Sequence, residues 1–364
     1  MLFPYTYINH DIEKLQDYLD HLFLEVWCKA DSRIDYDVSL LHPVLQDIIK
    51  EIYYDATVPH GKYLYEPIES VYKIFQTIDS ASKSTLAWAY VLNNSISNLC
   101  CNEAGYTAIT YEDLKVYHAD LPGVLKDFYE NLYTNVLGLK AVHSRIGELG
   151  DHYTEFVTVN DEGKCPYCGI NSIKGVYVEK REAYDHYLPK AIYPFNSVNF
   201  FNLAPMCHEC NSSYKLKKDP INARPKKNPL KNGAGKPRKA FYSYSPTIAP
   251  LDLQIIFKST DMSNLKPKDI EIKFNNPDIA EEIETWLDVF GIEERYKAKC
   301  LGKNDGRYWF EQVTDEFENA QKMLGAGFTK EQWLDYQIQA SKSKPLADAN
   351  FIKAQYLEAY KKVK

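Results

Sequence analysis

The stretches CPYCGI (residues 165–170) and MCHECN (residues 206–211) each hold two cysteines with two residues between them. A tight turn between such cysteines aims both thiolates at one ion, and two pairs complete a tetrahedral zinc site without an open position. We therefore predict a structural zinc ion held by Cys165, Cys168, Cys207 and Cys210. Disulfides are the alternative, which a reducing compartment disfavours. His208, between the second pair, is expected to be a bystander because four thiolates already fill the site.

Length and composition describe a globular chain. Its 364 residues are enough for two or three compact units, each with its own core. The chain is 45% hydrophobic and 26% charged, and no apolar run approaches the roughly 20 residues that span a bilayer. The start, MLFPYTYINHDIEKL, lacks a basic region followed by an apolar stretch and a cleavage site. We therefore expect a cytoplasmic protein without a membrane partner.

The pattern of residues changes twice along the chain and predicts three parts. Residues 1–155 repeat apolar residues at three- and four-residue steps, which is typical of amphipathic helices. Residues 156–240 hold turn residues, the cysteine pairs and short β-branched or aromatic runs. Residues 241–364 offer two alternating stretches, 251–257 and 269–274, that suit a hairpin and are followed by helical patterns. The expected fold class is α+β, with a helical N-terminal region, a zinc-bearing centre and a mixed C-terminal region of short strands and helices.

Four polar residues inside or beside the cysteine frame suggest a catalytic site: Asp185, His186, Asn202 and Asn211. Cleavage of a phosphodiester needs a base, and neutral imidazole can accept a proton from water at neutral pH. It also needs a cation at the leaving oxygen, and carboxylate and amide oxygens are ligands suited to Mg²⁺ or Mn²⁺. Neighbours on a strand point to opposite faces, so Asp185 and His186 can share one site only if the strand ends or bulges there.

The order of these residues resembles the HNH endonuclease family. DH-x2-P is followed by NL-x2-MC-x2-CN and a lysine, all bracketed by the CxxC pairs. The resemblance implies a central ββα-metal finger in which His186 is the general base and Asn202 ties down the loop between two strands. It also implies that Asp185 and Asn211 hold the catalytic metal and that the four cysteines hold structural zinc. We therefore expect an endonuclease that depends on Mg²⁺ or Mn²⁺ and hydrolyses phosphodiester bonds of DNA.

Two features depart from the family pattern. The last motif position is Asn211 rather than a histidine, which shifts the expected metal toward ions that prefer oxygen. The lysine that commonly follows is present as Lys215, after SSY. The alternative interpretation is that the polar residues are turn and capping residues of an inert zinc ribbon. The chain would then be a non-catalytic nucleic-acid-binding or scaffold protein.

Charge is unevenly distributed along the chain, although the net charge is -7. Residues 1–150 carry 11 basic and 21 acidic side chains, residues 151–240 carry 15 and 9, and residues 241–364 carry 17 and 20. Only the middle attracts a phosphate backbone. The basic residues expected to hold that backbone without reading its sequence are Lys215, Lys217, Lys218, Arg224, Lys226 and Lys227.

The acidic flanks predict weak binding to nucleic acid by the chain alone. We therefore expect the flanking regions to be docking or sensing elements for a protein partner, such as an ATPase or a sensor, or for a homo-oligomer. The resemblance also implies a biological context, because HNH proteins often occur in bacterial defence systems against phage. An effector of such a system is the expected role.

Overall fold

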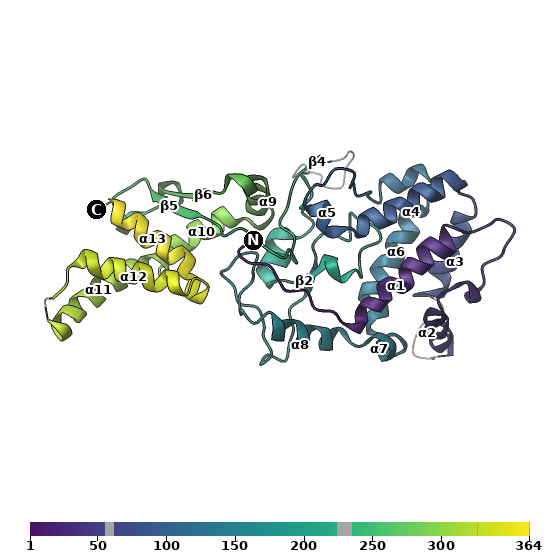
Figure 1. Cartoon of the computed structure of the whole chain (residues 1–364), viewed down its shortest axis with the longest axis horizontal. Helices are drawn as coiled ribbons and strands as arrows, with labels where there is room; N and C mark the ends of the chain where they lie inside the picture. Colours follow the sequence, from purple (N-terminus) through teal and green to yellow (C-terminus); the bar gives the residue numbers. More distant parts are fainter. Residues whose placement is uncertain (55–61, 224–234, 326, 364) are drawn as a thin grey trace. The chain divides into compact units, whose positions relative to one another are not determined.

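The computed structural model describes residues 1–54, 62–223, 235–325 and 327–363 (Figure 1). These residues group into two compact units. The larger unit contains Pro4–Gly163 and Ile173–Pro246, and the C-terminal unit contains Met1–Phe3, Lys164–Ser172 and Thr247–Lys364. Most of the central segment shares the larger unit with the helical region, whereas Lys164–Ser172 belongs to the C-terminal unit.

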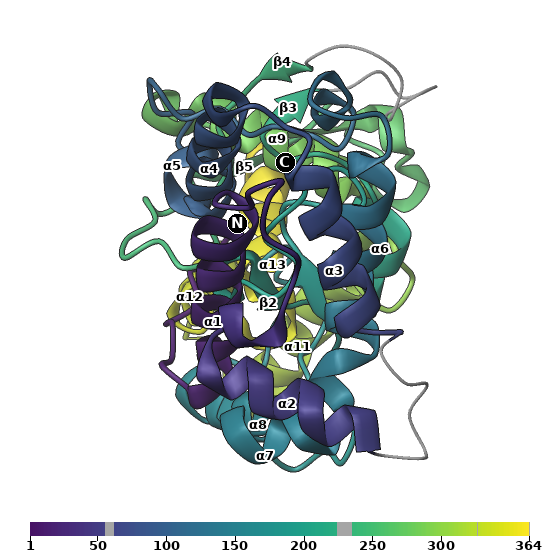
Figure 2. The same cartoon turned by 90° about the vertical axis from the view of Figure 1, so that its right-hand side faces the viewer.

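The larger unit is built mainly from helices. They are α1 Lys14–His21, α2 Pro43–Tyr54, α3 Tyr65–Phe75, α4 Ser80–Asn94, α5 Ile96–Cys100, α6 Leu121–Thr134, α7 Lys140–Ile146 and α8 Leu149–Val159. α4 illustrates how they begin, because the Asp79 carboxylate accepts hydrogen bonds from the backbone N–H groups of Ala81 and Ser82. α3 and α6 pack side by side (Figure 2). No helix among the described residues combines the length and apolar character needed to cross a membrane.

Short helical turns and strands complete this unit. The turns are η1 Asp11–Glu13, η2 Leu22–Trp27, η3 Val38–Leu40, η4 Asp113–Val116, η5 Val136–Gly138, η6 Phe200–Asn202 and η7 Cys210–Lys215. The strands form two antiparallel pairs: β1 Tyr184–His186 with β2 Leu203–Pro205, and β3 Asn222–Ala223 with β4 Lys236–Pro237. The combination of helices with short antiparallel strands confirms the expected α+β class.

The segment between β1 and β2 is part of the helical core. The ring of Phe195 is fully buried, with centroids 4.8 Å from Phe23, 5.3 Å from Tyr90 and 5.9 Å from Tyr129. The Asn93 amide in α4 also donates a hydrogen bond of 3.2 Å to the carbonyl of Pro194. Burying large aromatic rings is a major source of folding free energy. The loop between β1 and β2 is therefore packed into the core formed by the helices of this unit.

The C-terminal unit contains the expected hairpin. β5 Leu253–Phe257 pairs antiparallel with β6 Ile270–Phe274, and alternate residues of β5 are buried. The remaining elements are η8 Met262–Asn264, η9 Pro267–Asp269, η10 Pro277–Ile279, α9 Ala280–Phe290, α10 Ile292–Leu301, α11 Gly306–Leu324, α12 Lys330–Ser343, η11 Ala347–Ala349 and α13 Asn350–Val363. α13 packs against both β5 and α12 (Figure 1).

This unit also binds the first cysteine pair by hydrogen bonds to its backbone. The Trp286 indole donates to the Tyr167 carbonyl at 2.6 Å, and the Tyr296 hydroxyl donates to the Cys168 carbonyl at 3.0 Å. The N–H of Leu2 donates to the Pro166 carbonyl at 2.9 Å. The turn CPYC is therefore fixed by side chains from α9 and α10 and by the start of the chain.

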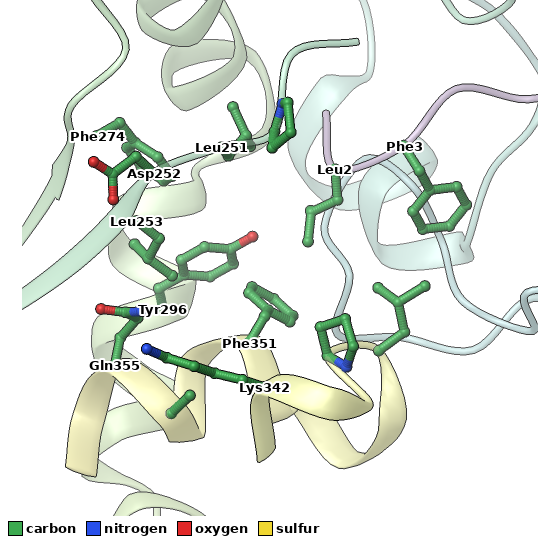
Figure 3. Close-up of a pocket in the computed structure, with 14 residues that line it drawn as sticks. Leu2, Phe3, Leu251, Asp252, Leu253, Phe274, Tyr296, Lys342, Phe351 and Gln355 are labelled. Carbon is green, nitrogen blue, oxygen red and sulfur yellow. The ribbon is translucent and has the colours of Figure 1, made fainter. Parts of the chain in front are cut away.

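A cavity of about 410 Å³ lies in the C-terminal unit. Figure 3 shows apolar side chains around it, from the start of the chain, from the hairpin and from α13; they include Leu2, Leu253, Phe274 and Phe351. None of the residues expected to be catalytic lines this cavity. Asp185, His186, Asn202 and Asn211 are in the larger unit.

Candidate metal centre and active site

Four buried cysteines gather at one point. The Sγ atoms of Cys165, Cys168, Cys207 and Cys210 all lie within 4.8 Å of one another. Zinc–sulfur bonds of about 2.3 Å in a tetrahedron place ligands roughly 3.8 Å apart, so the cluster is close to the size of such a site. His208 is exposed and does not belong to it. The four cysteines can hold a metal ion such as zinc, as the sequence predicted.

β1 ends at His186, the second residue of the Asp185–His186 pair. The strand runs from Tyr184 to His186 and pairs with β2, with Asp185 opposite Ala204 and His186 opposite Leu203. Because the strand stops at His186, the strict alternation of side chains does not apply beyond it. Asp185 and His186 are both paired residues of β1, so their side chains leave the strand on opposite faces.

Asn202 closes the loop between the two strands. Its side chain is fully buried, and its Oδ1 accepts a 2.7 Å hydrogen bond from the N–H of Leu188. Its Nδ2 donates to the carbonyl oxygens of Leu188 at 3.1 Å and of Asn196 at 3.3 Å. The amide thus joins both ends of the loop that carries Ser197, whose carbonyl contacts His186.

The His186 imidazole is held in one orientation by that carbonyl. Its Nε2 lies 2.9 Å from the Ser197 carbonyl oxygen. A carbonyl only accepts hydrogen bonds, so we assign the ring proton to Nε2 and the lone pair to Nδ1. Within the described ranges no protein atom hydrogen-bonds to Nδ1. An imidazole in this state has an acceptor available for a water proton.

Burial and neighbouring charges keep this imidazole neutral. Burial lowers the pKa of His186 to about 3, and the Lys190 and Lys215 charges act in the same direction. The hydrogen bond to Ser197 opposes the shift. The ring also packs edge-on against Tyr133, with centroids 4.6 Å apart. At pH 7 the His186 imidazole is therefore unprotonated, which is the state from which a histidine can accept a proton.

Asp185 forms a buried ion pair with Lys215. The ammonium nitrogen lies 2.9 Å from Oδ2 and 3.2 Å from Oδ1, and the hydrogen bond is made to Oδ1. Oδ2 is buried and, among the described residues, accepts no hydrogen bond despite that short ion-pair distance. Burial raises the pKa of the Asp185 carboxyl, and the Lys215 ammonium opposes the rise. The Lys215 ammonium thus already compensates the charge of this buried carboxylate.

Asn211 lies in η7, the helical turn that follows the second cysteine pair. A 3.0 Å hydrogen bond from the N–H of Leu216 to the Asn211 carbonyl spans five residues, which is the pattern of a π-turn. Residues four apart in such a turn project to the same side. Asn211 is therefore on the side of η7 from which Lys215 reaches Asp185. Its side chain is half-buried.

Three residues near His186 were not anticipated from the sequence. The Lys190 ammonium lies 5.1 Å from the centroid of the Tyr133 ring, and the Arg181 guanidinium carbon lies 5.9 Å from the centroid of Tyr184. Arg181 and Lys190 stand four residues before Asp185 and four after His186. Their equal spacing around the Asp185–His186 pair could have indicated these two residues from the sequence. Tyr133 belongs to α6, and no feature of the sequence indicated its contact with His186.

The structure separates the six basic residues expected to bind nucleic acid into three groups. Lys217 is exposed and Lys218 is half-buried. Lys215 is fully buried in its ion pair, so it does not lie on the surface where a backbone would be held. Arg224, Lys226 and Lys227 lie outside the described residues.

Comparisons with known proteins give one partial similarity. The chain is 37% identical over 87 residues to Protein ea31 of Escherichia phage lambda. The matched part is 24% of this chain and 25% of ea31, so it spans about a quarter of that protein. No protein-family model matches the chain. No solved structure matches it either.

Proposed function

We propose that this protein is a metal-dependent endonuclease that hydrolyses phosphodiester bonds of DNA. The observation that carries the proposal is the combination of His186 Nδ1, without a partner among the described residues, with the buried carboxylate of the adjacent Asp185. One is a proton acceptor and the other a cation ligand. These are the two functions that phosphodiester hydrolysis needs.

In this proposal the chain's own residues prepare the attack of water. His186 takes a proton from water at Nδ1 while the Ser197 carbonyl keeps the Nε2 proton in place, so the developing imidazolium stays hydrogen-bonded. Asp185 and Asn211 would hold a Mg²⁺ or Mn²⁺ ion, which supplies positive charge at the departing 3′ oxygen and leaves a 5′ phosphate. Hard oxygen ligands fit these ions.

Cations beside the base fit the charge of the substrate. A phosphodiester next to Lys190 would offset one of the charges that hold down the pKa of His186. Its basicity would therefore rise when substrate is bound, and a pKa closer to the working pH makes proton transfer more effective. Arg181 adds another cation close to Tyr184 on β1.

The buried Asp185–Lys215 pair also suits a second candidate, a non-catalytic zinc-ribbon scaffold in which the pair only stabilises the fold. Nicking of supercoiled plasmid with Mg²⁺ or Mn²⁺ separates the two functions. We expect His186→Ala to lower the nicking rate by at least about 100-fold, with His118→Ala as a control distant from this site in the sequence. Equal nicking by His186→Ala and the unmodified protein would overturn the nuclease proposal.

We also propose that a protein partner, an ATPase or a sensor, or self-association delivers the nuclease to DNA in a defence system against phage. The net charge of -7, with acidic residues in excess on both flanks, supports this proposal because such flanks repel a phosphate backbone. Sedimentation combined with plasmid nicking tests it. A monomer that cuts plasmid freely at physiological salt, without any addition, would contradict it.

A further inference from the structure

Lys215 is a charged side chain without any exposed surface. Its Nζ donates hydrogen bonds to the His186 carbonyl at 2.8 Å and to Asp185 Oδ1 at 3.2 Å. Burying an ammonium group costs several kcal/mol unless an opposite charge compensates it. Asp185 is that charge, so each member of the pair depends on the other to remain buried and ionised.

The pair holds the two proposed reacting groups together. Lys215 ends η7, the element that also carries Asn211, and its ammonium reaches the last residue of β1. Three contributors to the site, η7, the Asp185 carboxylate and the backbone of His186, thus meet at a single nitrogen atom. A cation already occupies one side of the carboxylate on which the proposed metal depends.

We propose, building on the nuclease function above, that Lys215 is a resident cation that limits metal binding at Asp185 until a phosphodiester is bound. The ammonium neutralises the carboxylate and repels a divalent ion that approaches Oδ2. The negative charge of a bound phosphodiester reverses this balance, because it attracts both cations. Metal and nucleic acid then bind cooperatively, and the free protein carries little metal at this site.

Binding of Mn²⁺, followed by electron paramagnetic resonance of the free ion, tests this inference without any cleavage. The protein is first loaded with zinc so that the cysteine cluster is filled. Lys215→Met keeps most of the length of the unbranched side chain and removes its charge. We expect this variant to bind Mn²⁺ at least about fivefold more tightly than the unmodified protein in the absence of DNA, and Asp185→Asn to lose the site. Equal or weaker binding by Lys215→Met would overturn the resident-cation role.

A measurement on the unmodified protein keeps the test decisive if Lys215→Met does not fold. A short phosphorothioate duplex, which supplies the phosphate backbone but resists cleavage, should tighten Mn²⁺ binding at least about tenfold at constant ionic strength. Asp185→Asn with the same duplex measures Mn²⁺ bound by the duplex itself. An unchanged affinity in the presence of the duplex would overturn the inference and leave the metal site intact.

If the proposed nuclease function is wrong, the Mn²⁺ binding measurements give a different result. If the unmodified protein and the Asp185→Asn variant bind Mn²⁺ equally, both with and without the duplex, no metal binds at this carboxylate. That outcome removes the nuclease proposal itself, together with the inference that depends on it.

Discussion

The imidazole Nε2 of His186 and the carbonyl oxygen of Ser197 lie 2.9 Å apart across the loop between β1 and β2. This contact determines which ring nitrogen is free, and it depends on the loop keeping its shape. Asn202 maintains that shape through hydrogen bonds to Leu188 and Asn196. Stability and chemistry are therefore coupled in this loop.

Asn202→Ala should both destabilise the protein and impair nicking. Removing the amide leaves buried backbone groups of Leu188 without their partner, which costs about 2–4 kcal/mol in the free energy of unfolding. Chemical denaturation measures the loss, with Asn98→Ala in α5 as a control. A variant as stable and as active as the unmodified protein would show that Asn202 does not hold the loop.

Lys190→Met should raise the pKa of His186, because removing a nearby positive charge favours the protonated imidazole. The same change should weaken DNA binding, since one cation beside the site is lost. An NMR titration of the His186 ring and fluorescence anisotropy with a labelled duplex measure the two effects. Lys180→Met, which removes an exposed lysine from the neighbouring loop, is the matched control. A pKa of His186 that stays at about 3 would contradict the expected influence of Lys190.

Stability should fall as the pH is lowered from about 6.5 to about 4.5, partly because of His152. Burial lowers the pKa of His152 to about 4, and the nearby His10 acts in the same direction. Its folded pKa is below the unfolded value near 6.5, so its contribution is present above pH 6.5 and is lost as the pH falls toward 4. The loss over this range is about 2 kcal/mol for this one histidine. His186, whose pKa is also lowered, adds to it.

Unfolding measured at a series of pH values checks this expectation. His152→Gln removes the titrating group and should flatten the pH dependence by a similar amount. For each protein, the free energy of unfolding at the upper end of the pH range is compared with that at the lower end. This difference does not include the pH-independent stability that the substitution itself removes. Identical pH dependence in the variant and the unmodified protein would rule out a buried neutral His152.

Removal of zinc should destabilise the protein. We expect the unmodified protein to bind one zinc ion per chain through the four clustered thiols and to melt at least about 5 °C lower after chelation. Cys168→Ser should lower both the zinc content and the melting temperature. Cys101→Ser, at an exposed cysteine outside the cluster, should change neither. A zinc-free protein with unchanged melting would contradict a structural ion.

The sequence predicted the parts of the site that depend on spacing along the chain. The cysteine cluster follows from two CxxC pairs, because each turn positions two thiols locally. The hairpin of β5 and β6 follows from alternation of apolar and polar residues in the same way.

Features that depend on long-range packing were not predictable from the sequence. Lys215 looked like a surface residue in a basic run, and only the approach of η7 to β1 explains its burial. Tyr133 carries no motif, because its position against His186 is set by how α6 packs. Phe195 likewise carries no motif, and its ring contacts Phe23 and Tyr129 only because the loop between β1 and β2 packs against the helices.

Ser197 connects α6 directly to the imidazole of His186. Its hydroxyl donates a 2.9 Å hydrogen bond to the Tyr129 carbonyl in α6, while its own carbonyl orients the imidazole of His186. A shift of α6 would therefore move the carbonyl that orients this ring. If the proposed nuclease function holds, a molecule that binds α6 should change the cleavage rate without contacting the substrate.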